Sequence, residues 1–308
     1  MLGYVVRRLI HGIIVLAVVM VVVFLIFQVL GDPVRKILPT NVTDEQVAAF
    51  RQANGFNDPV LERFIRFVGD VMSLNFGKSY TLHRESFPVV MAALPHTFIL
   101  AGCAFVVGLL IAAILGSIAA LRHGSGVDRG IVAFGTVLAS VPEFWVGLLL
   151  IVYVAVRAAH LPTSGYGINA HLILPVATLA LAPIGRLTSV IRTSTLDVLR
   201  EQHVLVATAR GLPRRTVLGQ YVLRNASVPT IAMGTMELTR LLVGGAVVVE
   251  TVFAWPGIGQ LYVQGMAAFD LPLITATVFI ATVLVLVLNL GVDIFYTYVD
   301  PRVRYGNG

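Results

Sequence analysis

Charge and cysteine are both scarce in this chain. Asp, Glu, Lys and Arg together make up 12% of its 308 residues, about half of the roughly 25% found in soluble domains. The single cysteine, Cys103, excludes a disulfide framework and a cysteine-based metal site, and we interpret it as a buried small apolar residue. Because 57% of the residues are hydrophobic, the composition predicts a membrane protein and excludes a soluble globular domain.

Sequence motifs typical of enzymes are also missing. The chain has no His-Glu-x-x-His zinc pair and no Gly-x-Ser-x-Gly nucleophile turn. Gly77-Lys78-Ser79 matches the end of a phosphate-binding loop, but the first glycine of that pattern would fall on Met72. The sequence therefore predicts that the chain is not an enzyme, that it binds no cofactor or metal, and that it does not itself hydrolyse a nucleotide.

Long apolar runs dominate the sequence. The first, residues 9–30, contains no Asp, Glu, Lys or Arg and is long enough to cross a hydrocarbon core of about 30 Å as a helix. No small-x-small cleavage site follows it, so we expect a retained span instead of a signal peptide. Because the runs are continuously apolar and not alternating, helices are the predicted spanning form. Five further runs qualify: about 98–121, 131–156, 172–191, 230–253 and 272–296.

Arginines gather on one side of these six runs. With six crossings, the termini and the loops around 122–130 and 192–229 share a side and carry twelve arginines, whereas the two short loops opposite carry only Arg157. The positive-inside rule therefore predicts that both termini and residues 196–229 are cytoplasmic. This asymmetry accounts for the net charge of +6, and we expect no nucleic-acid partner.

The outer segment, residues 31–95, is predicted to contain two short helices. Residues 43–46, Thr-Asp-Glu-Gln, form a capping-box pattern that opens the first helix, and Asn54-Gly55 ends it. Asp58-Pro59 has the pattern of an N-cap followed by a first-turn proline. The second helix carries an apolar stripe, which we expect to pack over the outer mouth of the bundle instead of lying on the membrane surface. Its members are Val60, Phe64, Phe67, Val71 and Leu74.

Residues 196–229 form a basic island between the fourth and fifth runs. A helix is predicted from about Leu196 to Gly211, where glycine suits a left-handed C-cap, and Pro213 begins a second helix with an apolar face. The pattern alone also fits an ordinary helix–turn–helix connection. A loop that only faces water, however, needs neither the apolar run 204–207 nor a tight turn. The segment is therefore predicted to dock against a partner.

Four of the ionisable residues inside predicted spans are singled out, because a charge is costly there and usually faces a partner or water. They are Glu143, Arg186, Glu237 and Arg240. One interpretation is internal neutralisation, with Glu237 paired to Arg240 three residues on and Glu143 paired to an arginine of a neighbouring helix. The other is a polar lining for a solute that carries charges, such as a zwitterionic peptide. The two interpretations are compatible.

Three prolines, Pro142, Pro175 and Pro183, lie inside or at the edges of the spans. Proline removes a helical hydrogen bond, so kinked helices are predicted at these positions. Such kinks fit a gated path and also fit simple packing.

Seven short motifs, spread over nearly the whole chain, carry a resemblance to a known family. They are Leu-Gly-Asp-Pro at 30–33, Asn-Phe-Gly-Lys-Ser at 75–79, Leu-Pro-His-Thr at 94–97, Val-Pro-Glu-Phe-Trp at 141–145, Leu-Arg-Asn-Ala-Ser-Val-Pro at 223–229, Val-Glu-Thr-Val-Phe-Ala-Trp-Pro-Gly-Ile-Gly at 249–259 and Asp-Pro-Arg-Val-Arg-Tyr at 300–305. Any one alone would be weak evidence, but together they are specific. The chain resembles the membrane-spanning permease subunits of bacterial dipeptide and oligopeptide ABC importers, specifically the first permease of such systems.

The resemblance implies an all-α polytopic protein of the bacterial cytoplasmic membrane, with six transmembrane helices in the type I ABC importer permease fold. On this basis we expect four segments. Residues 1–30 form the cytoplasmic N-terminus and first transmembrane helix, and 31–95 form an extracytoplasmic segment. Residues 96–298 form a core of five transmembrane helices that includes the cytoplasmic hairpin 196–229. Residues 299–308 form a cytoplasmic tail.

The resemblance also implies partners. These are a second homologous permease, two cytoplasmic subunits that bind ATP and Mg²⁺, an extracytoplasmic substrate-binding protein and the lipid bilayer. The implied function is that of a permease which, with the second permease, forms the translocation path of an ATP-driven importer of di- or oligopeptides. Haem or nickel stays open as cargo. A passive pore and a membrane-embedded enzyme are the remaining alternatives.

In this family the cytoplasmic hairpin is the coupling segment, which inserts into a groove on the ATP-hydrolysing subunit. The family pattern is Glu-Ala-Ala, three residues, Gly, and later a proline. Ala207, Gly211 and Pro229 keep this spacing, while Leu205 and Val206 replace the first two positions. The residues that the resemblance assigns to ATPase coupling are Ala207, Thr208, Arg210, Gly211, Leu212 and Pro229.

Some intramembrane charges depart from the family pattern. A small polar residue is expected where Glu143 stands, and apolar or neutral residues are expected at Glu237 and Arg240. These differences are candidates for substrate specificity. We therefore assign Glu143, Arg186, Glu237 and Arg240 to the predicted translocation path.

Overall fold

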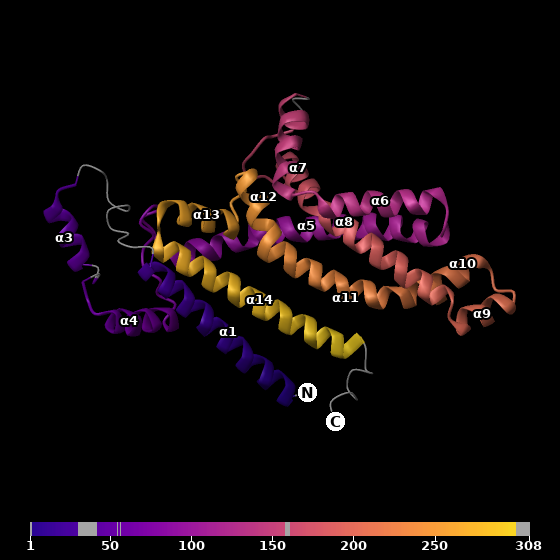
Figure 1. Cartoon of the computed structure of the whole chain (residues 1–308), viewed down its shortest axis with the longest axis horizontal. Coiled ribbons are helices and arrows are strands. Elements are labelled where there is room, and N and C mark those ends of the chain that lie inside the picture. Colours follow the sequence, from indigo (N-terminus) through magenta and orange to yellow (C-terminus); the bar gives the residue numbers. More distant parts are fainter. Residues whose placement is uncertain (1, 30–41, 54, 56, 158–160, 300–308) are drawn as a thin grey trace. The chain divides into compact units, whose positions relative to one another are not determined.

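Helices make up the part of the chain that the computed structural model describes, which is residues 2–29, 42–53, 55, 57–157 and 161–299 (Figure 1). These ranges contain one isolated antiparallel bridge, between Lys78 and Glu85, and no strand. The motifs at 30–33 and 300–305 lie outside the described residues, as does Asn54 at the predicted end of the first outer helix.

The chain divides into two compact units, Met1–His96 with Pro256–Leu290, and Thr97–Trp255 with Gly291–Gly308. The first unit contains α1 (Leu2–Val29), α3 (Asp44–Ala53), α4 (Val60–Met72), α13 (Ile258–Ala268) and most of α14 (Leu271–Val299). Helix α5 (Ser86–Leu121) begins in the first unit and continues in the second. The second unit contains α6 (Gly126–Ser140), α7 (Glu143–Leu150), η1 (Ile151–Val156), α8 (Ala170–Leu199), α9 (Gln202–Ala209), α10 (Arg214–Thr216), η2 (Val217–Leu223), α11 (Arg224–Arg240), η3 (Leu241–Gly245) and α12 (Ala246–Val252), where η marks a π-helix.

Six segments are long and apolar enough to cross a membrane, provided that one bent pair of helices counts as a single span. This confirms the predicted all-α polytopic membrane protein. The five unbroken segments are Val6–Gln28, Ser86–Leu121, Ala170–Leu199, Arg214–Val252 and Leu271–Asp293. The predicted third span over 131–156 is bent in the structure, where Gly126–Ser140 and Glu143–Val156 meet at an angle of 95°. The interruption predicted at Pro142 is therefore confirmed.

The bend in the third span follows from Pro142. Val141 and Pro142 both have extended backbone, with ψ values of 131° and 129°, because proline lacks an N–H and disfavours helix at the preceding residue. Helix α7 is then held by close packing at Gly147, where a β-carbon would lie 3.1 Å from Cγ1 of Val252. Pro175 and Pro183, also predicted to kink a helix, lie inside α8 without interrupting it.

Helix α8 is the centre of the second unit, with 16 of its 30 residues buried. Glycines let neighbouring helices approach it closely, as small residues do between membrane helices. A β-carbon on Gly185 of α8 would lie 2.2 Å from the carbonyl oxygen of Gly135 on α6, and one on Gly116 of α5 would lie 2.8 Å from Cβ of Ile191. The position of α8 therefore depends on backbone contact with both neighbours.

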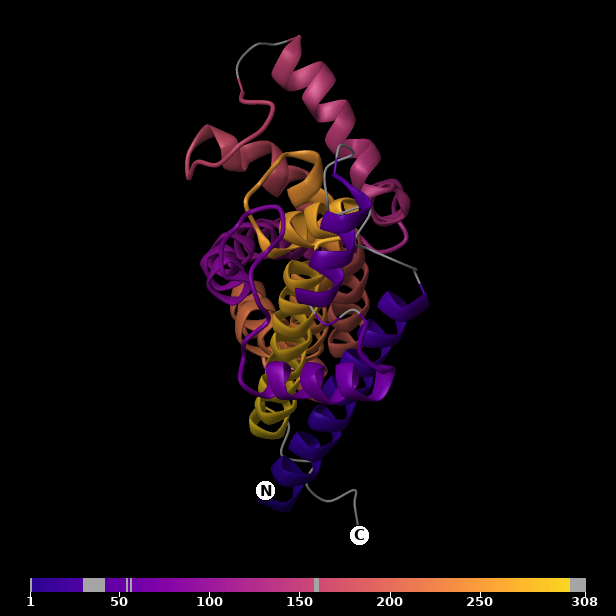
Figure 2. The ribbon, with the colours of Figure 1, turned by 90° about the vertical axis from the view of Figure 1, so that its left-hand side faces the viewer.

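The first unit has an apolar core built from the outer segment, α5, α13 and α14. Its buried members are Phe76, Val90, Ala93, Ile258, Leu273, Ala276 and Ile280. Helices α1 and α14 run side by side in both views (Figures 1 and 2), and a β-carbon on Gly12 would lie 3.5 Å from a methyl carbon of Leu286.

Helix α4 packs on this unit through part of its predicted stripe. The ring of Phe24 on α1 lies 5.2 Å from that of Phe64 and 5.4 Å from that of Phe67, and Val71 packs against the core. The expected packing is confirmed for these three stripe residues. Val60 and Leu74 are 56% and 43% exposed, so the prediction was wrong for the two ends of the stripe.

The capping box of α3 is confirmed. Gln46 N–H donates to Oγ1 of Thr43 at 3.3 Å, and Thr43 N–H donates to Oε1 of Gln46 at 3.0 Å, which satisfies two orphan donors reciprocally. The start of α4 differs from the prediction. Pro59 is the N-cap and has no side-chain cap bond, because the carboxylate of Asp58 pairs with Arg66 instead.

Candidate functional site

Three of the four ionisable residues predicted inside the spans form one ion-pair network in the second unit. Glu237 of α11 is fully buried, and Arg186 of α8 binds both of its carboxylate oxygens, Nε to Oε1 at 2.7 Å and Nη2 to Oε2 at 2.8 Å. Arg240 donates from Nη1 to Oε1 at 2.9 Å. The predicted pairing of Glu237 with Arg240 is confirmed, and Arg186 is a further partner. Two guanidiniums with charge-assisted bonds satisfy the buried carboxylate.

The fourth residue, Glu143, begins α7 directly after the bend. Its carboxylate lies beside Gly245 at the end of η3, since a β-carbon on Gly245 would lie 3.3 Å from Oε2 and 3.6 Å from Oε1. Arg186 and Glu237 act on this carboxylate electrostatically. Glu143 makes no ion pair or hydrogen bond among the described residues, so the predicted ion pair with an arginine of a neighbouring helix does not form.

The four side chains differ in how much of each is exposed to solvent. The side chain of Glu237 is fully buried, while those of Arg186 and Arg240 are 32% and 59% exposed, and Glu143 is half-buried. A charged side chain within a membrane span faces water or protein because lipid is costly for it. The two arginines and two glutamates sum to zero formal charge. The arrangement therefore offers separated positive and negative charges, and no nucleophile with an adjacent base.

The residues assigned to coupling, apart from Pro229, lie in the hairpin between the end of α8 and the start of α11 (Figure 1). Gly211 has a φ of 75°, and its N–H donates to the carbonyl of Thr208 at 3.0 Å, so the predicted glycine C-cap is confirmed. The first hairpin helix begins at Gln202 and not near Leu196. The reason is that α8 continues through Leu199, after which Glu201 has extended backbone with a ψ of 147°.

The hairpin has a small apolar core of its own, made by Val198, Val204, Ala207, Val217, Val222 and Ala226. The run 204–207 thus has two faces. Val204 and Ala207 are each 3% exposed, whereas Leu205 and Val206 are 58% and 49% exposed. Leu205 and Val206, which replace the first two family positions, form the outward apolar surface, and the residue pattern had not assigned them to the site.

The other assigned coupling residues differ in position. Thr208, Arg210 and Gly211 are exposed, and Leu212 is half-buried. Ala207 points into the hairpin core. Pro229 is exposed but lies inside α11, beyond the hairpin turn. The exposed surface of the turn therefore includes residues 205–206, 208–211 and 213–215.

Two polar clusters brace the hairpin and its surroundings. His203 contacts Glu201 at 3.0 Å and Asn225 at 3.2 Å, which ties α9 to α11. Arg192 of α8 binds the buried Asp128 of α6 at 2.5 and 2.8 Å. The sequence analysis missed Asp128, although Ser125-Gly126-Val127-Asp128 matches a capping-box pattern and Ser125 Oγ does accept from the N–H of Asp128.

In the first unit, Asp270 fixes part of the outer segment to the start of α14. Its Oδ2 accepts from Ser79 Oγ at 2.6 Å and from the N–H and hydroxyl of Thr81 at 2.9 and 2.7 Å. Its Oδ1 accepts from Leu273 N–H at 3.3 Å. Burial acts to raise the pKa of Asp270, but these hydrogen bonds act more strongly together, and the pKa lies below its ordinary value. An N-cap pattern, Asp followed by a first-turn proline at Pro272, was the available sequence signal.

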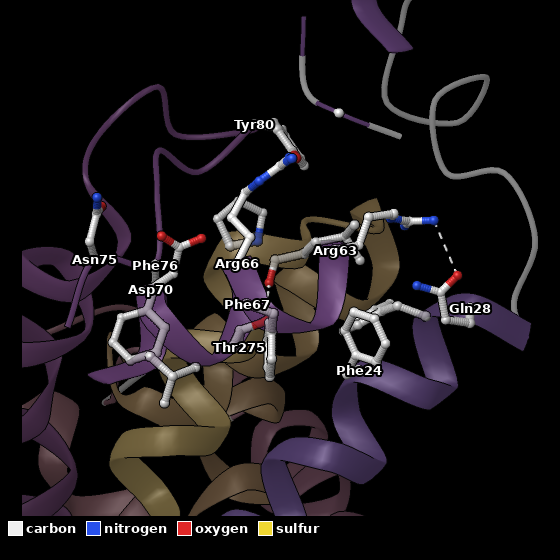
Figure 3. A pocket seen from close by; sticks show the side chains of 15 residues that line it. Phe24, Gln28, Arg63, Arg66, Phe67, Asp70, Asn75, Phe76, Tyr80 and Thr275 are labelled. Carbon is white, nitrogen blue, oxygen red and sulfur yellow. Dashed lines mark hydrogen bonds between the residues drawn. The ribbon is translucent and has the colours of Figure 1, made fainter. Parts of the chain in front are cut away.

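A pocket of about 220 Å³ opens between α1, α4 and the outer segment of the first unit (Figure 3). Arg63 extends toward Gln28 and donates to its Oε1 at 3.2 Å. Burial raises the pKa of Asp70 at this pocket, against the effect of nearby Arg66, and burial also raises the pKa of Tyr80. The sequence analysis had not singled out these polar residues.

The described residues form no cluster of side chains that could bind a metal ion. No group of three or more His, Cys, Asp or Glu side chains there is placed to hold a metal ion. Cys103 is half-buried within α5.

Comparison with known families identifies the chain. Residues 112–305 match the profile of the "binding-protein-dependent transport system inner membrane component" family. The chain belongs to this family. Residues 1–101 match the corresponding N-terminal region of such membrane components. This inner membrane component is therefore a multi-pass inner membrane protein that works with other transporter subunits, and the resemblance drawn from the seven motifs is confirmed.

Several relatives of this inner membrane component match it nearly end to end. It is 34% identical over 99% of its length to the whole of the oligopeptide transport system permease protein AppB of Bacillus subtilis. It is also 34% identical, over 98% of its length and 99% of the relative, to the probable peptide ABC transporter permease protein y4tP of Sinorhizobium fredii. The metal-staphylopine import system permease protein CntB of Staphylococcus aureus is 35% identical over 86% of this chain and 85% of its own length.

Solved structures show the same fold. A chain of the MetNI methionine ABC transporter in an inward-facing conformation aligns with a TM-score of 0.57 at 18% identity, covering 69% of this chain and 96% of that chain. A chain of an amino acid ABC transporter aligns with a TM-score of 0.51 at 16% identity, covering 68% and 94% respectively. The predicted type I ABC importer permease fold is confirmed.

Proposed function

We propose that this chain is the membrane-spanning permease subunit of an ATP-driven importer of di- or oligopeptides. The observation that carries the proposal is similarity over nearly the full length, 98–99% of the chain, to permeases of peptide transport systems. The similarity to a metal-staphylopine permease covers less, 86% of the chain. Peptide is therefore the favoured cargo over nickel, haem or another small solute.

The proposal includes three kinds of protein partner. A second homologous permease completes the path, two cytoplasmic subunits bind ATP and Mg²⁺, and an extracytoplasmic binding protein delivers the peptide. Both termini and the hairpin 196–229 lie in the cytoplasm, which the arginine distribution supports. Residues 31–95 lie outside. This chain contributes no ATP site and no cofactor.

The hairpin supplies the mechanical connection in this proposal. Closure of the two ATPases around ATP moves the hairpin, and the spans follow as rigid bodies so that the path opens alternately outward and inward. Two features support this role. The hairpin packs around its own core, so it can move as one piece, and it exposes apolar Leu205 and Val206 beside the turn at Gly211.

The translocation path in this proposal is lined by Glu143, Arg186, Glu237 and Arg240. The partial exposure of both arginines within spans supports an aqueous lining. Thr188, Ser194 and Thr195 of α8 point inward to packed surroundings, whereas Ser189 and Thr193 are exposed on the same helix as Arg186. The polar face of α8 thus continues from the charges toward the hairpin.

The test is uptake by the assembled importer in lipid vesicles. The chain is reconstituted with its partner permease, ATPases and cargo-loaded binding protein, and accumulation of labelled di- and oligopeptides is compared with that of nickel and haem. We expect ATP-dependent accumulation of peptide only. Accumulation of nickel or haem without peptide would overturn the cargo assignment, and flux through this chain alone would indicate a passive pore.

A further inference from the structure

Arg240 retains binding capacity that the ion-pair network does not use. Arg186 already satisfies both oxygens of Glu237 in a bidentate arrangement, which is the strong geometry for a guanidinium and a carboxylate. Arg240 adds one contact, from Nη1, and keeps 59% of its side chain exposed. A guanidinium carries five N–H donors, so most donors of Arg240 point away from Glu237.

The carboxylate of Glu143 is likewise able to bind a further group, in this case a cation. This half-buried carboxylate makes no ion pair or hydrogen bond among the described residues, and Arg186 acts on it only electrostatically. Gly245 leaves it room, since a β-carbon there would lie only 3.3 Å from Oε2. An unpaired carboxylate in such surroundings is costly, and a cationic ligand would remove that cost.

Arg240 and Gly245, the glycine beside the Glu143 carboxylate, are close together on the fifth span. The π-helix η3 begins directly after Arg240 and ends at Gly245. Hydrogen bonds from residue i to i+5 place residues 240 and 245 one turn apart on the same side. One helical turn rises about 5.4 Å, and a two-residue peptide spans at most about 7 Å. The backbone separation of Arg240 and the glycine beside Glu143 is thus comparable to the length of a short peptide.

We propose that Glu143 binds the protonated amino terminus of the transported peptide and that Arg240 binds its terminal carboxylate. This inference rests on the proposed peptide import function. Arg186 and Glu237 act differently, since they are a neutral pair that positions Arg240. A dipeptide engages both residues at once, and a longer peptide engages them one after the other as it moves.

A purely structural role for the four charged residues would lead to a different arrangement of charges. Arg186 alone neutralises Glu237, so a structural network needs neither a second arginine nor a carboxylate that touches no cation. The excess positive charge at Arg240 instead complements the carboxylate of a zwitterionic peptide, and the excess negative charge at Glu143 complements its amino group. Binding leaves the total charge of the site unchanged.

The test compares peptides that differ at one end only. Import by the reconstituted complex is measured for a dipeptide with free ends, its N-acetylated form and its C-amidated form. Each is first confirmed to load the binding protein and is supplied at saturation, so that the selectivity of the binding protein does not enter. We expect Glu143→Gln to lower the uptake rate about tenfold for peptides with a free amine and to leave the rate for the N-acetylated form unchanged. Arg240→Gln should lower uptake of free carboxylates about tenfold and spare the C-amidated form.

The matched control is Glu62→Gln, which removes an exposed glutamate from α4 and should change none of the three rates. Arg240→Gln leaves the Arg186–Glu237 pair intact, so it should assemble even if Glu143→Gln does not. Equal loss for capped and free peptides, or no loss, in Arg240→Gln would overturn the inference. Failure of the unsubstituted complex to import any peptide would instead contradict the proposed function.

Discussion

Asp270 is fully buried, yet it accepts four hydrogen bonds, three of them at one carboxylate oxygen. Two hydroxyls and two backbone N–H groups replace the water that the carboxylate loses on folding. The residues that donate are nearly two hundred positions away in sequence, apart from Leu273 in the same turn. A single side chain thus joins the outer segment to the start of α14.

We predict that Asp270→Asn destabilises the first unit by about 1–3 kcal/mol at neutral pH. The reason is that the NH2 group of asparagine would face hydroxyl and N–H groups that need an acceptor. The pKa of Asp270 is lower in the folded chain than in the unfolded chain. Its stabilising contribution is therefore complete above the ordinary carboxyl pKa of about 3.9, and is lost as the pH falls through the folded value. Thermal unfolding in detergent, followed from pH 7 to pH 3, should show the variant and wild type converging at low pH.

Asp58→Asn provides the matched control for this prediction. Asp58 pairs with Arg66 at a partly exposed site, where an ion pair contributes about 1 kcal/mol at most. A destabilisation by Asp270→Asn that is no larger than that of the control would contradict the proposed role, as would a difference that is independent of pH.

Glu250 and Glu237 show what sequence reasoning can and cannot find at this scale. The pairing of Glu237 with Arg240 follows from helical spacing, because the partners lie on one helix. Arg186 lies 51 positions away, and the hydroxyl of Thr97 that donates to buried Glu250 at 2.6 Å lies 153 positions away. Such partners depend on how the helices pack against one another, and a local sequence pattern does not predict that packing.

At the level of helices, the sequence predicted which helices exist better than it predicted where they begin and end. Apolar length located all six membrane segments, and the capping box located the start of α3 correctly. Pro142, Pro175 and Pro183 looked alike in sequence, but only Pro142 ends a helix, because Val141 before it also adopts extended backbone and Gly147 packs α7 in a new direction. The hairpin boundary was misplaced since α8 continues to Leu199, where tertiary packing of Val198 supports it.

The turn of the hairpin offers a test of coupling. Gly211 has a φ of 75°, and no atom lies within 4 Å of where its β-carbon would stand. A substitution there acts through backbone conformation and not through a clash. We predict that Gly211→Val, which disfavours this conformation by about 1–2 kcal/mol, shifts the exposed residues 205–206. It should lower peptide uptake and the ATP hydrolysis stimulated by the binding protein about tenfold.

Gly211→Asn is the matched control, because asparagine tolerates positive φ. It should keep uptake close to that of wild type, and both variants should be present in the membrane in equal amounts. Undiminished uptake by Gly211→Val, or equal loss in both variants, would contradict the assignment of this turn to coupling.

At the scale of the whole molecule, orientation in the membrane is the property to measure. The chain has one native cysteine, Cys103, which can be replaced by serine before single cysteines are introduced elsewhere. We predict that Leu61→Cys on α4, at a position 69% exposed, reacts in intact cells with a membrane-impermeant maleimide. Arg214→Cys in the exposed hairpin should react only after the membrane is permeabilised, because the positive-inside rule places it in the cytoplasm.

The cysteine-free background is the control for labelling. Reaction of the hairpin cysteine in intact cells would overturn the proposed topology and, with it, any contact with cytoplasmic ATPases. Reaction of neither position in intact cells would contradict an external location for α4.

The balance of two arginines against two glutamates in the proposed path has an electrical consequence. A membrane potential does work of about 2.3 kcal/mol on each elementary charge that crosses 100 mV. Glu143, Arg186, Glu237 and Arg240 carry no net charge together, and a peptide with one free amine and one free carboxylate carries none either. Voltage therefore does no net work when these groups shift together across the bilayer, and the cell's electrical state neither drives nor opposes that movement.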